Sequence, residues 1–163
     1  MTWDMVKDTV QWAGQIIVAG KPAASLPKQM ANAVPDVDDW QALTDARGPQ
    51  ETPWNIVYTN GFGIDVVKVK LQLNFDYGAR YKGGGAFITN VWVEVFQCDV
   101  KWGYSVDLSF SPQKPENAAS FGQPTHARLP CTVWGSVSTP FWTDNMQWGF
   151  TLFGDAHTEV RQG

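Results

Sequence analysis

The feature that most constrains the fold of this chain is a change of hydrophobic period close to Trp54. Before this point apolar residues recur every three or four positions, and after it they alternate with polar ones. The alternation is clearest where Val67, Val69, Leu71, Leu73, Phe75 and Tyr77 are separated by Lys68, Lys70, Gln72, Asn74 and Asp76. Because successive side chains of a strand point to opposite faces, this pattern predicts a strand with one buried and one wet face.

More strands are predicted further along the chain. The glycines at 83–85 indicate a hairpin turn, and the strand over residues 87–98 is apolar on both faces. Residues 104–110, 127–137 and 146–153 are further candidate strands, separated by polar and Pro-rich stretches at 112–124 and 138–145. Since no helical crossovers lie between them, we expect a mainly β fold, an antiparallel β-sandwich or flattened barrel over residues 54–163. Trp92 and Trp134 are expected in its core.

The first 53 residues are predicted to form a helical N-terminal arm and connector. Over residues 2–19 the spacing of three and four gives an amphipathic helix, with Thr2 as N-cap and Gly20 and Pro22 as its stop. Two short helices, over residues 25–34 and 36–46, are expected in the connector. The side chains expected to contact a membrane or a neighbouring subunit are Trp3, Val6, Val10, Trp12, Ile16 and Ile17. The helix can pack on the β domain or on another subunit, or lie in a membrane interface; its acidic polar stripe disfavours anionic lipid.

Charge and hydropathy exclude several classes of function. The chain has 12 Lys and Arg against 16 Asp and Glu, and the basic residues are scattered, so we expect no nucleic-acid partner. No apolar run reaches the ~18 residues of a membrane-spanning helix, and the N-terminus lacks the features of a secretory signal. The compartment stays open, with extracellular action possible. Cys98 and Cys131 are compatible with one disulfide or with two buried thiols.

The residues that catalysis usually needs do not form a recognisable motif. His126 and His157 are the two histidines, and neither has the spacing of a known nucleophile motif; a pair of His126 with Cys131 is the nearest case. Asp155, His157 and Glu159 alternate, so an extended tail would place them on one face, where they could hold a cation or act as acid and base. We expect no catalytic residue, no metal and no cofactor, and therefore a protein that is not an enzyme.

Aromatic residues at strand ends and in loops are the more informative feature. Rings next to Asp and Asn can stack on a sugar while the polar groups bind its hydroxyls, and the same rings can settle at a bilayer interface. Phe141 and Trp142 are expected to be exposed. The candidate ligand-binding residues are Phe141, Trp142, Asp144, Asn145, Trp148, Trp102, Tyr104 and Tyr81.

In outline the chain resembles the actinoporin-like cytolysins and their fungal fruit-body lectin relatives. The resemblance consists of an N-terminal amphipathic helix, the segment Thr52-Pro53-Trp54, the sheet pattern and the aromatic loops. It implies a sandwich that recognises lipid or glycan headgroups and a helix that lines a pore, although the acidic helix and the inserted connector depart from the family pattern. We therefore expect a non-enzymatic protein that binds a cell surface, lipid or glycan, through its aromatic loops. The alternatives are a self-assembling protein whose helix packs on a neighbouring subunit, and a small metal-dependent hydrolase that uses Asp155, His157 and Glu159.

Overall fold

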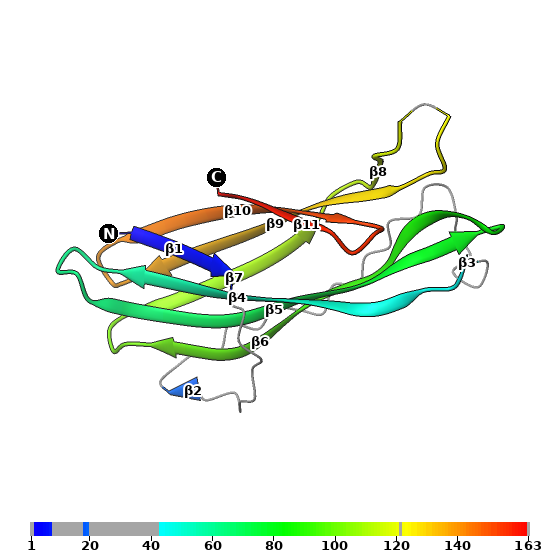
Figure 1. Cartoon of the computed structure of the whole chain (residues 1–163). Coiled ribbons are helices and arrows are strands. Elements are labelled where there is room, and N and C mark those ends of the chain that lie inside the picture. Colours follow the sequence, from blue (N-terminus) through cyan, green and yellow to red (C-terminus); the bar gives the residue numbers. More distant parts are fainter. Residues whose placement is uncertain (1, 8–17, 20–42, 121, 163) are drawn as a thin grey trace.

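The computed structural model describes residues 2–7, 18–19, 43–120 and 122–162 of the chain. Within these residues all regular elements are strands, and they form two sheets that lie over one another (Figure 1). The long strands are β4 (Arg47–Thr59), β5 (Asp65–Tyr81), β6 (Gly84–Val100), β7 (Ser105–Pro112), β9 (Ala127–Ser138) and β10 (Thr143–Phe153). The short ones are β1 (Thr2–Lys7), β2 (Val18–Ala19), β3 (Leu43–Thr44), β8 (Glu116–Asn117) and β11 (Thr158–Gln162).

The first sheet has the order β1-β4-β5-β6-β2, with β3 also paired to β5, and the second has the order β11-β10-β9-β7, with β8 paired to β9. All these pairs are antiparallel except β2 with β6. The prediction of a mainly β, antiparallel fold is confirmed, and its strands are divided between two sheets. The predicted hairpin at the glycines is also confirmed, because Lys82 and Gly83 join β5 to β6 with the positive φ angles that tight two-residue hairpin turns use.

The core lies between the two sheets, as the period of two requires. Its members alternate along each strand: Trp54, Ile56 and Tyr58 on β4, Val67 to Phe75 at every second position on β5, and Leu129, Cys131 and Val133 on β9. The rings of Trp54 and Phe150, one from each sheet, meet edge to face with centroids 5.4 Å apart. Burial of these apolar faces is the main stabilising contribution to the fold.

A break in register on β6 changes which residues reach this core. Lys70 pairs with Gln97 while Leu71 pairs with Val95, so one extra residue of β6 is accommodated between these pairs. As a result Cys98 stands opposite Val69 and is buried with it. Without this bulge, strict alternation would put Cys98 on the face of β6 opposite to that of Val95. Cys98 and Cys131 are both buried, and they do not form a disulfide with each other.

The predicted N-terminal helix is not tested as a whole, because residues 8–17 lie outside the described residues, as does the helix expected over 25–34. The ends of the first range are strands: Thr2–Lys7 pairs with β4, and Val18–Ala19 pairs with β6. Leu43–Thr44, predicted at the end of a connector helix, is strand β3, and β4 begins at Arg47 rather than Trp54. At these positions inter-strand hydrogen bonds replace the intrahelical ones expected from local pattern.

Candidate functional site

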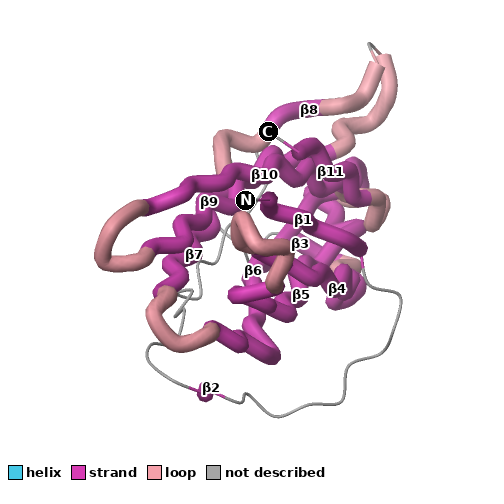
Figure 2. The backbone as a smooth tube through the Cα atoms, turned by 90° about the vertical axis from the view of Figure 1, so that its left-hand side faces the viewer, coloured by secondary structure: helices cyan, strands magenta, loops and turns pink. Residues whose placement is uncertain are grey.

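Three loops come together at one end of the molecule, on the left of Figure 1 and towards the viewer in Figure 2. They are the β4–β5 loop (residues 60–64), the β6–β7 loop (101–104) and the β9–β10 loop (139–142). We call this region the loop end. The β4–β5 loop closes a hairpin of the first sheet, the β9–β10 loop closes a hairpin of the second, and the β6–β7 loop carries the chain from the first sheet to the second.

The loops are held together by three aromatic side chains, Tyr58, Tyr104 and Trp142, one next to or within each loop. The ring of Trp142 lies 6.1 Å from that of Tyr58, tilted by 38°, and 6.1 Å from that of Tyr104, at 67°. Such offset and edge contacts are favourable beyond the area that they bury. These rings therefore form a support under the loops that joins the two sheets.

Asn60 fixes the shape of the β4–β5 loop. Its side-chain oxygen accepts hydrogen bonds from the backbone N–H groups of Phe62 at 3.0 Å and Ile64 at 3.1 Å, and its amide nitrogen donates to the Tyr104 hydroxyl at 3.3 Å. Asn is suited to this role because its short side chain can replace backbone hydrogen-bond partners within a turn. The loop is thus preorganised and tied to its β6–β7 neighbour.

Each loop presents a large apolar side chain to solvent. Phe62 is 91% exposed, Trp102 98% and Phe141 93%, and Ile64 is also exposed. Single exposed apolar residues are ordinary on a protein surface, but here three loops at the same end of the molecule each carry one. We call Phe62, Trp102 and Phe141 the apolar tips.

The carboxylates of the loop end are engaged by neighbouring groups. The buried Tyr58 hydroxyl donates to Asp144 Oδ2 at 3.0 Å, and burial, followed by this carboxylate, raises the Tyr58 pKa well above its ordinary value. Lys68 Nζ lies 3.0 Å from Asp65 Oδ2, and the Thr59 hydroxyl donates to Asp65 Oδ1 at 2.9 Å. These two contacts lower the pKa of Asp65. Of these two carboxylates, Asp65 is thus compensated by a cation, whereas Asp144 is held in place by a neutral hydroxyl and keeps its negative charge.

The predicted ligand-binding residues divide between several places. Phe141 and Trp102 are exposed tips of the loop end, as expected for Phe141, whereas Trp142 and Tyr104 are half-buried supports. Trp148 is 1% exposed and belongs to the core, because its position on β10 has the inward parity; this corrects its assignment to a ligand surface. Asp144 points inward and accepts a hydrogen bond from Tyr58. Asn145 is on the outer face of β10, and Tyr81 lies at the end of β5 that is remote from the loop end.

The loop end also contains residues that sequence reasoning missed, Phe62 and Ile64. The signal was present as the segment Asn60-Gly61-Phe62-Gly63, in which an apolar residue lies between two glycines of a turn. The core prediction was wrong for Trp134, which is 50% exposed, and Trp92 is only half-buried. The side chains predicted to contact a membrane or subunit, Trp3, Val6, Val10, Trp12, Ile16 and Ile17, lie outside the part of the chain whose side chains are described.

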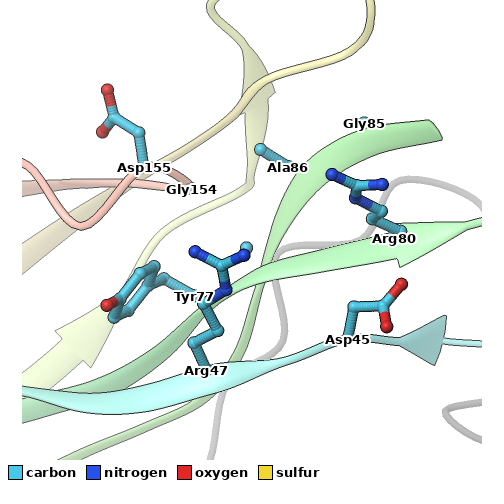
Figure 3. Close-up of a pocket in the computed structure, with 9 residues that line it drawn as sticks. Asp45, Arg47, Tyr77, Arg80, Gly85, Ala86, Gly154 and Asp155 are labelled. Atoms are coloured by element: carbon cyan, nitrogen blue, oxygen red, sulfur yellow. The ribbon is translucent and has the colours of Figure 1, made fainter.

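The opposite end of the molecule has a pocket of about 560 Å³ (Figure 3). Arg47 and Arg80 line it together with Tyr77, and two carboxylates, Asp45 and Asp155, do so as well. Within the described residues neither arginine forms an ion pair, so their donors are free for an anionic group. The two carboxylates offset this positive charge, and the pocket has no strong preference for anions.

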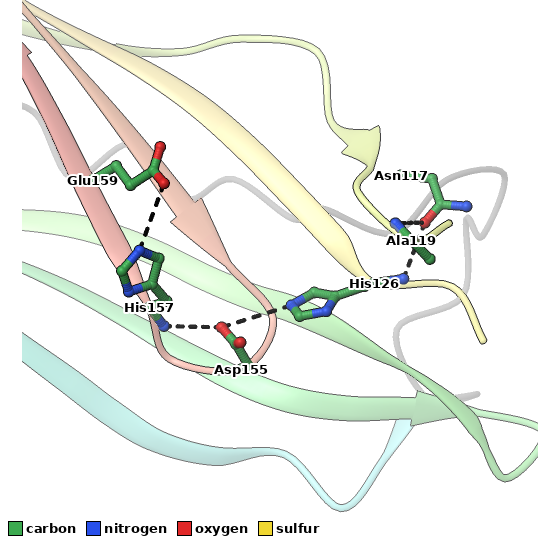
Figure 4. A network of polar contacts seen from close by, with 6 residues as sticks. All are labelled: Asn117, Ala119, His126, Asp155, His157 and Glu159. Carbon is green, nitrogen blue, oxygen red and sulfur yellow. Dashed lines mark hydrogen bonds and ion pairs between the residues drawn. The ribbon is translucent and has the colours of Figure 1, made fainter. Parts of the chain in front are cut away.

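A polar network adjoins this pocket through Asp155 (Figure 4). Asp155 Oδ1 lies 3.6 Å from His126 Nε2 and accepts a hydrogen bond of 3.0 Å from the His157 backbone N–H; His157 Nε2 lies 3.6 Å from Glu159 Oε1. The three side chains expected to act together are thus divided, because Asp155 lies in the turn before β11 and is close to His126, whereas His157 is close to Glu159. Among the described residues no group of three or more His, Cys, Asp and Glu is placed to hold a metal.

Cys131 points into the core, where burial raises its thiol pKa to about 12, and no contact joins it to His126.

In the described part of the chain no helix is sufficiently long and apolar to cross a membrane. Comparison of the sequence and structure with family models, curated proteins and solved structures finds no match. The function therefore has to be inferred from the residues themselves.

Proposed function

We propose that the protein attaches to a lipid–water interface through its loop end. The observation that supports this is the set of three apolar tips, each more than nine-tenths exposed and each on a different loop of the same end. Exposed aromatic side chains are energetically favoured at the headgroup region of a bilayer, where their rings leave water without entering the hydrocarbon core. Three tips on one rigid support can enter such a surface together, so little conformational entropy is lost on binding.

Apolar insertion rather than charge is expected to dominate the attachment. Asp65 is paired with Lys68, which offsets its charge, whereas Asp144 accepts a hydrogen bond from the neutral Tyr58 hydroxyl and keeps its charge. Lys101, exposed beside Trp102, is the cation nearest to that tip in sequence. One lysine adds only ~1 kcal/mol at an anionic surface. We therefore expect binding to zwitterionic phosphatidylcholine vesicles that changes little between low and high salt.

Vesicle co-sedimentation tests this proposal directly. Removing one apolar tip loses up to ~1.5–3 kcal/mol of burial, and because insertion at an interface is partial we expect about a tenfold weaker partition for Trp102→Ser. The triple variant of Phe62, Trp102 and Phe141 to Ser should no longer sediment with vesicles. Trp134→Ser is the matched control, because it removes an exposed tryptophan that lies outside the loop end.

Two outcomes would refute the proposal: failure of the wild-type protein to bind phosphatidylcholine vesicles, or equal binding by the triple variant. Release of an entrapped dye distinguishes pore formation from attachment alone. Light scattering without lipid, for the full chain and the triple variant, tests whether the apolar tips instead join copies of the protein.

A further inference from the structure

The outer face of the second sheet carries an exposed tryptophan in an unusual setting. Trp134 lies in the middle of β9, with β7 on one side and β10 on the other, and half of its surface is accessible to solvent. It lines a shallow depression of about 450 Å³ together with Asp107, Ser109, Ser136 and Asn145. We call these five residues the tryptophan face.

Strand register places the members of this face next to one another. Asp107 pairs with Ser136, which pairs with Asn145, so a carboxylate, a hydroxyl and an amide form one row across three strands. Ser109 pairs with Trp134 in the adjacent row of the same face. Side chains directly opposite on neighbouring antiparallel strands are within ~5.5 Å at their Cβ atoms, so both rows border the indole ring.

The polar side chains of the tryptophan face are not used by the protein. Within the described residues none of them makes a side-chain hydrogen bond or ion pair. The outer face of the other sheet differs, because there Gln72 donates to Asn74 and the Trp92 indole N–H donates to Glu94. The tryptophan face thus offers donors and acceptors around an apolar ring, all available to a ligand.

We propose that the tryptophan face is a binding site for a neutral saccharide. A pyranose ring has an apolar face of C–H groups that can stack on an indole, and hydroxyls at its edge that can bind a carboxylate, an amide and serine hydroxyls together. The depression is of the size of sites for small ligands. Asp107 is the one charged side chain among the residues that line it, which disfavours phosphate, sulfate and acidic sugars.

This site is separate from the loop end and does not depend on the proposed lipid attachment. None of the apolar tips or their supporting rings lines the depression. Trp134 is far in sequence from Phe62 and Trp102, and it shares a hairpin only with Phe141. Substitutions can therefore remove one binding activity and leave the other in place. A protein with both sites would hold a glycan while its loops rest on a lipid surface.

Affinity electrophoresis through gels that contain a neutral polysaccharide tests the proposal. Gels with a soluble cellulose derivative, glycol chitin, mannan or galactan are run with the full-length wild-type protein and its variants. We expect at least one polysaccharide to retard the wild type. The dissociation constant of Trp134→Ala for that polysaccharide should be at least about tenfold higher, and that of Trp134→Phe should lie between the two. Asp107→Asn and Asn145→Ala should each weaken binding, whereas Trp102→Ser, which removes an exposed tryptophan elsewhere, should bind as the wild type does.

The proposal is overturned if none of the four polysaccharides retards the wild type, or if Trp134→Ala is retarded as strongly as the wild type. Retardation by a sulfated polysaccharide only would also refute it, since the site would then select anions. Because Trp134 is on the surface, its replacement should leave the thermal unfolding midpoint unchanged. A variant that lost binding and also a large part of its stability would count against a direct contact, and the conservative Phe variant would then decide.

Discussion

The hydrogen bond from Tyr58 to Asp144 joins the two sheets beneath the loop end, and its removal should be measurable in the stability of the whole domain. Tyr58 is completely buried, and its hydroxyl donates to a carboxylate oxygen 3.0 Å away. A hydrogen bond to a charged partner contributes ~1.5–3 kcal/mol, more than a neutral one. Tyr58→Phe keeps the ring against Trp142 and removes only the donor. We therefore expect a loss of about 2 kcal/mol, and a urea midpoint lower by ~1 M.

The assay is urea unfolding followed by tryptophan fluorescence and circular dichroism, for Tyr58→Phe, Asp144→Ala and the double variant. Because each single variant breaks the same contact, the double variant should lose less than the sum, by ~1 kcal/mol or more. Tyr77→Phe is the matched control, since the Tyr77 hydroxyl has no hydrogen bond to a described residue. Strict additivity of the two single losses would refute a direct interaction between Tyr58 and Asp144.

The same contact predicts a pH dependence. Burial, and then Asp144, raises the pKa of Tyr58 in the folded protein above the ordinary tyrosine value of 10.0. A folded-state pKa above the unfolded one stabilises the fold fully below pH 10 and progressively less as the pH rises beyond it, because the unfolded chain releases the proton first. Wild-type stability should thus fall more steeply above pH 10 than that of Tyr58→Phe. Parallel stability curves for the two proteins above pH 10 would contradict the raised pKa.

Two further predictions concern the core. Burial raises the pKa of the Cys131 thiol to about 12, so at pH 8 it should be alkylated only as the protein unfolds, as peptide mass spectrometry can measure; rapid labelling of the native protein would show that the thiol is accessible. A Cβ atom at Gly154 would overlap the backbone oxygen of Ala86, so Gly154→Ala should cost about 3 kcal/mol in thermal or urea unfolding. Gly61→Ala, where a Cβ meets nothing within 4 Å, should change stability by less than ~0.5 kcal/mol.

Much of the candidate site could have been found from parity along the strands. Leu129, Cys131 and Val133 share one parity on β9, which by itself assigns Trp134 to the opposite, outer face. Trp148 has the parity of Phe150 on β10 and is therefore a core residue. Both were misassigned because the hydrophobicity of tryptophan and its nearness to a loop were given more weight than position along the strand. A large aromatic residue is compatible with either face of a sheet. Because side chains alternate along a strand, however, the face of one residue determines the face of every other residue in that regular stretch.

The sequence by itself determined the element type after residue 54, the hairpin turn at Gly83 and the burial of one face of each strand, because a period of two and the conformational freedom of glycine act locally. Only the tertiary structure decided the pairing of Thr2–Lys7 with β4, the bulge that buries Cys98, and the meeting of the loops that carry Phe62, Trp102 and Phe141. These features depend on contacts between segments far apart in the chain. Backbone pairing and close packing between such segments outweigh local preference, and no local pattern records them.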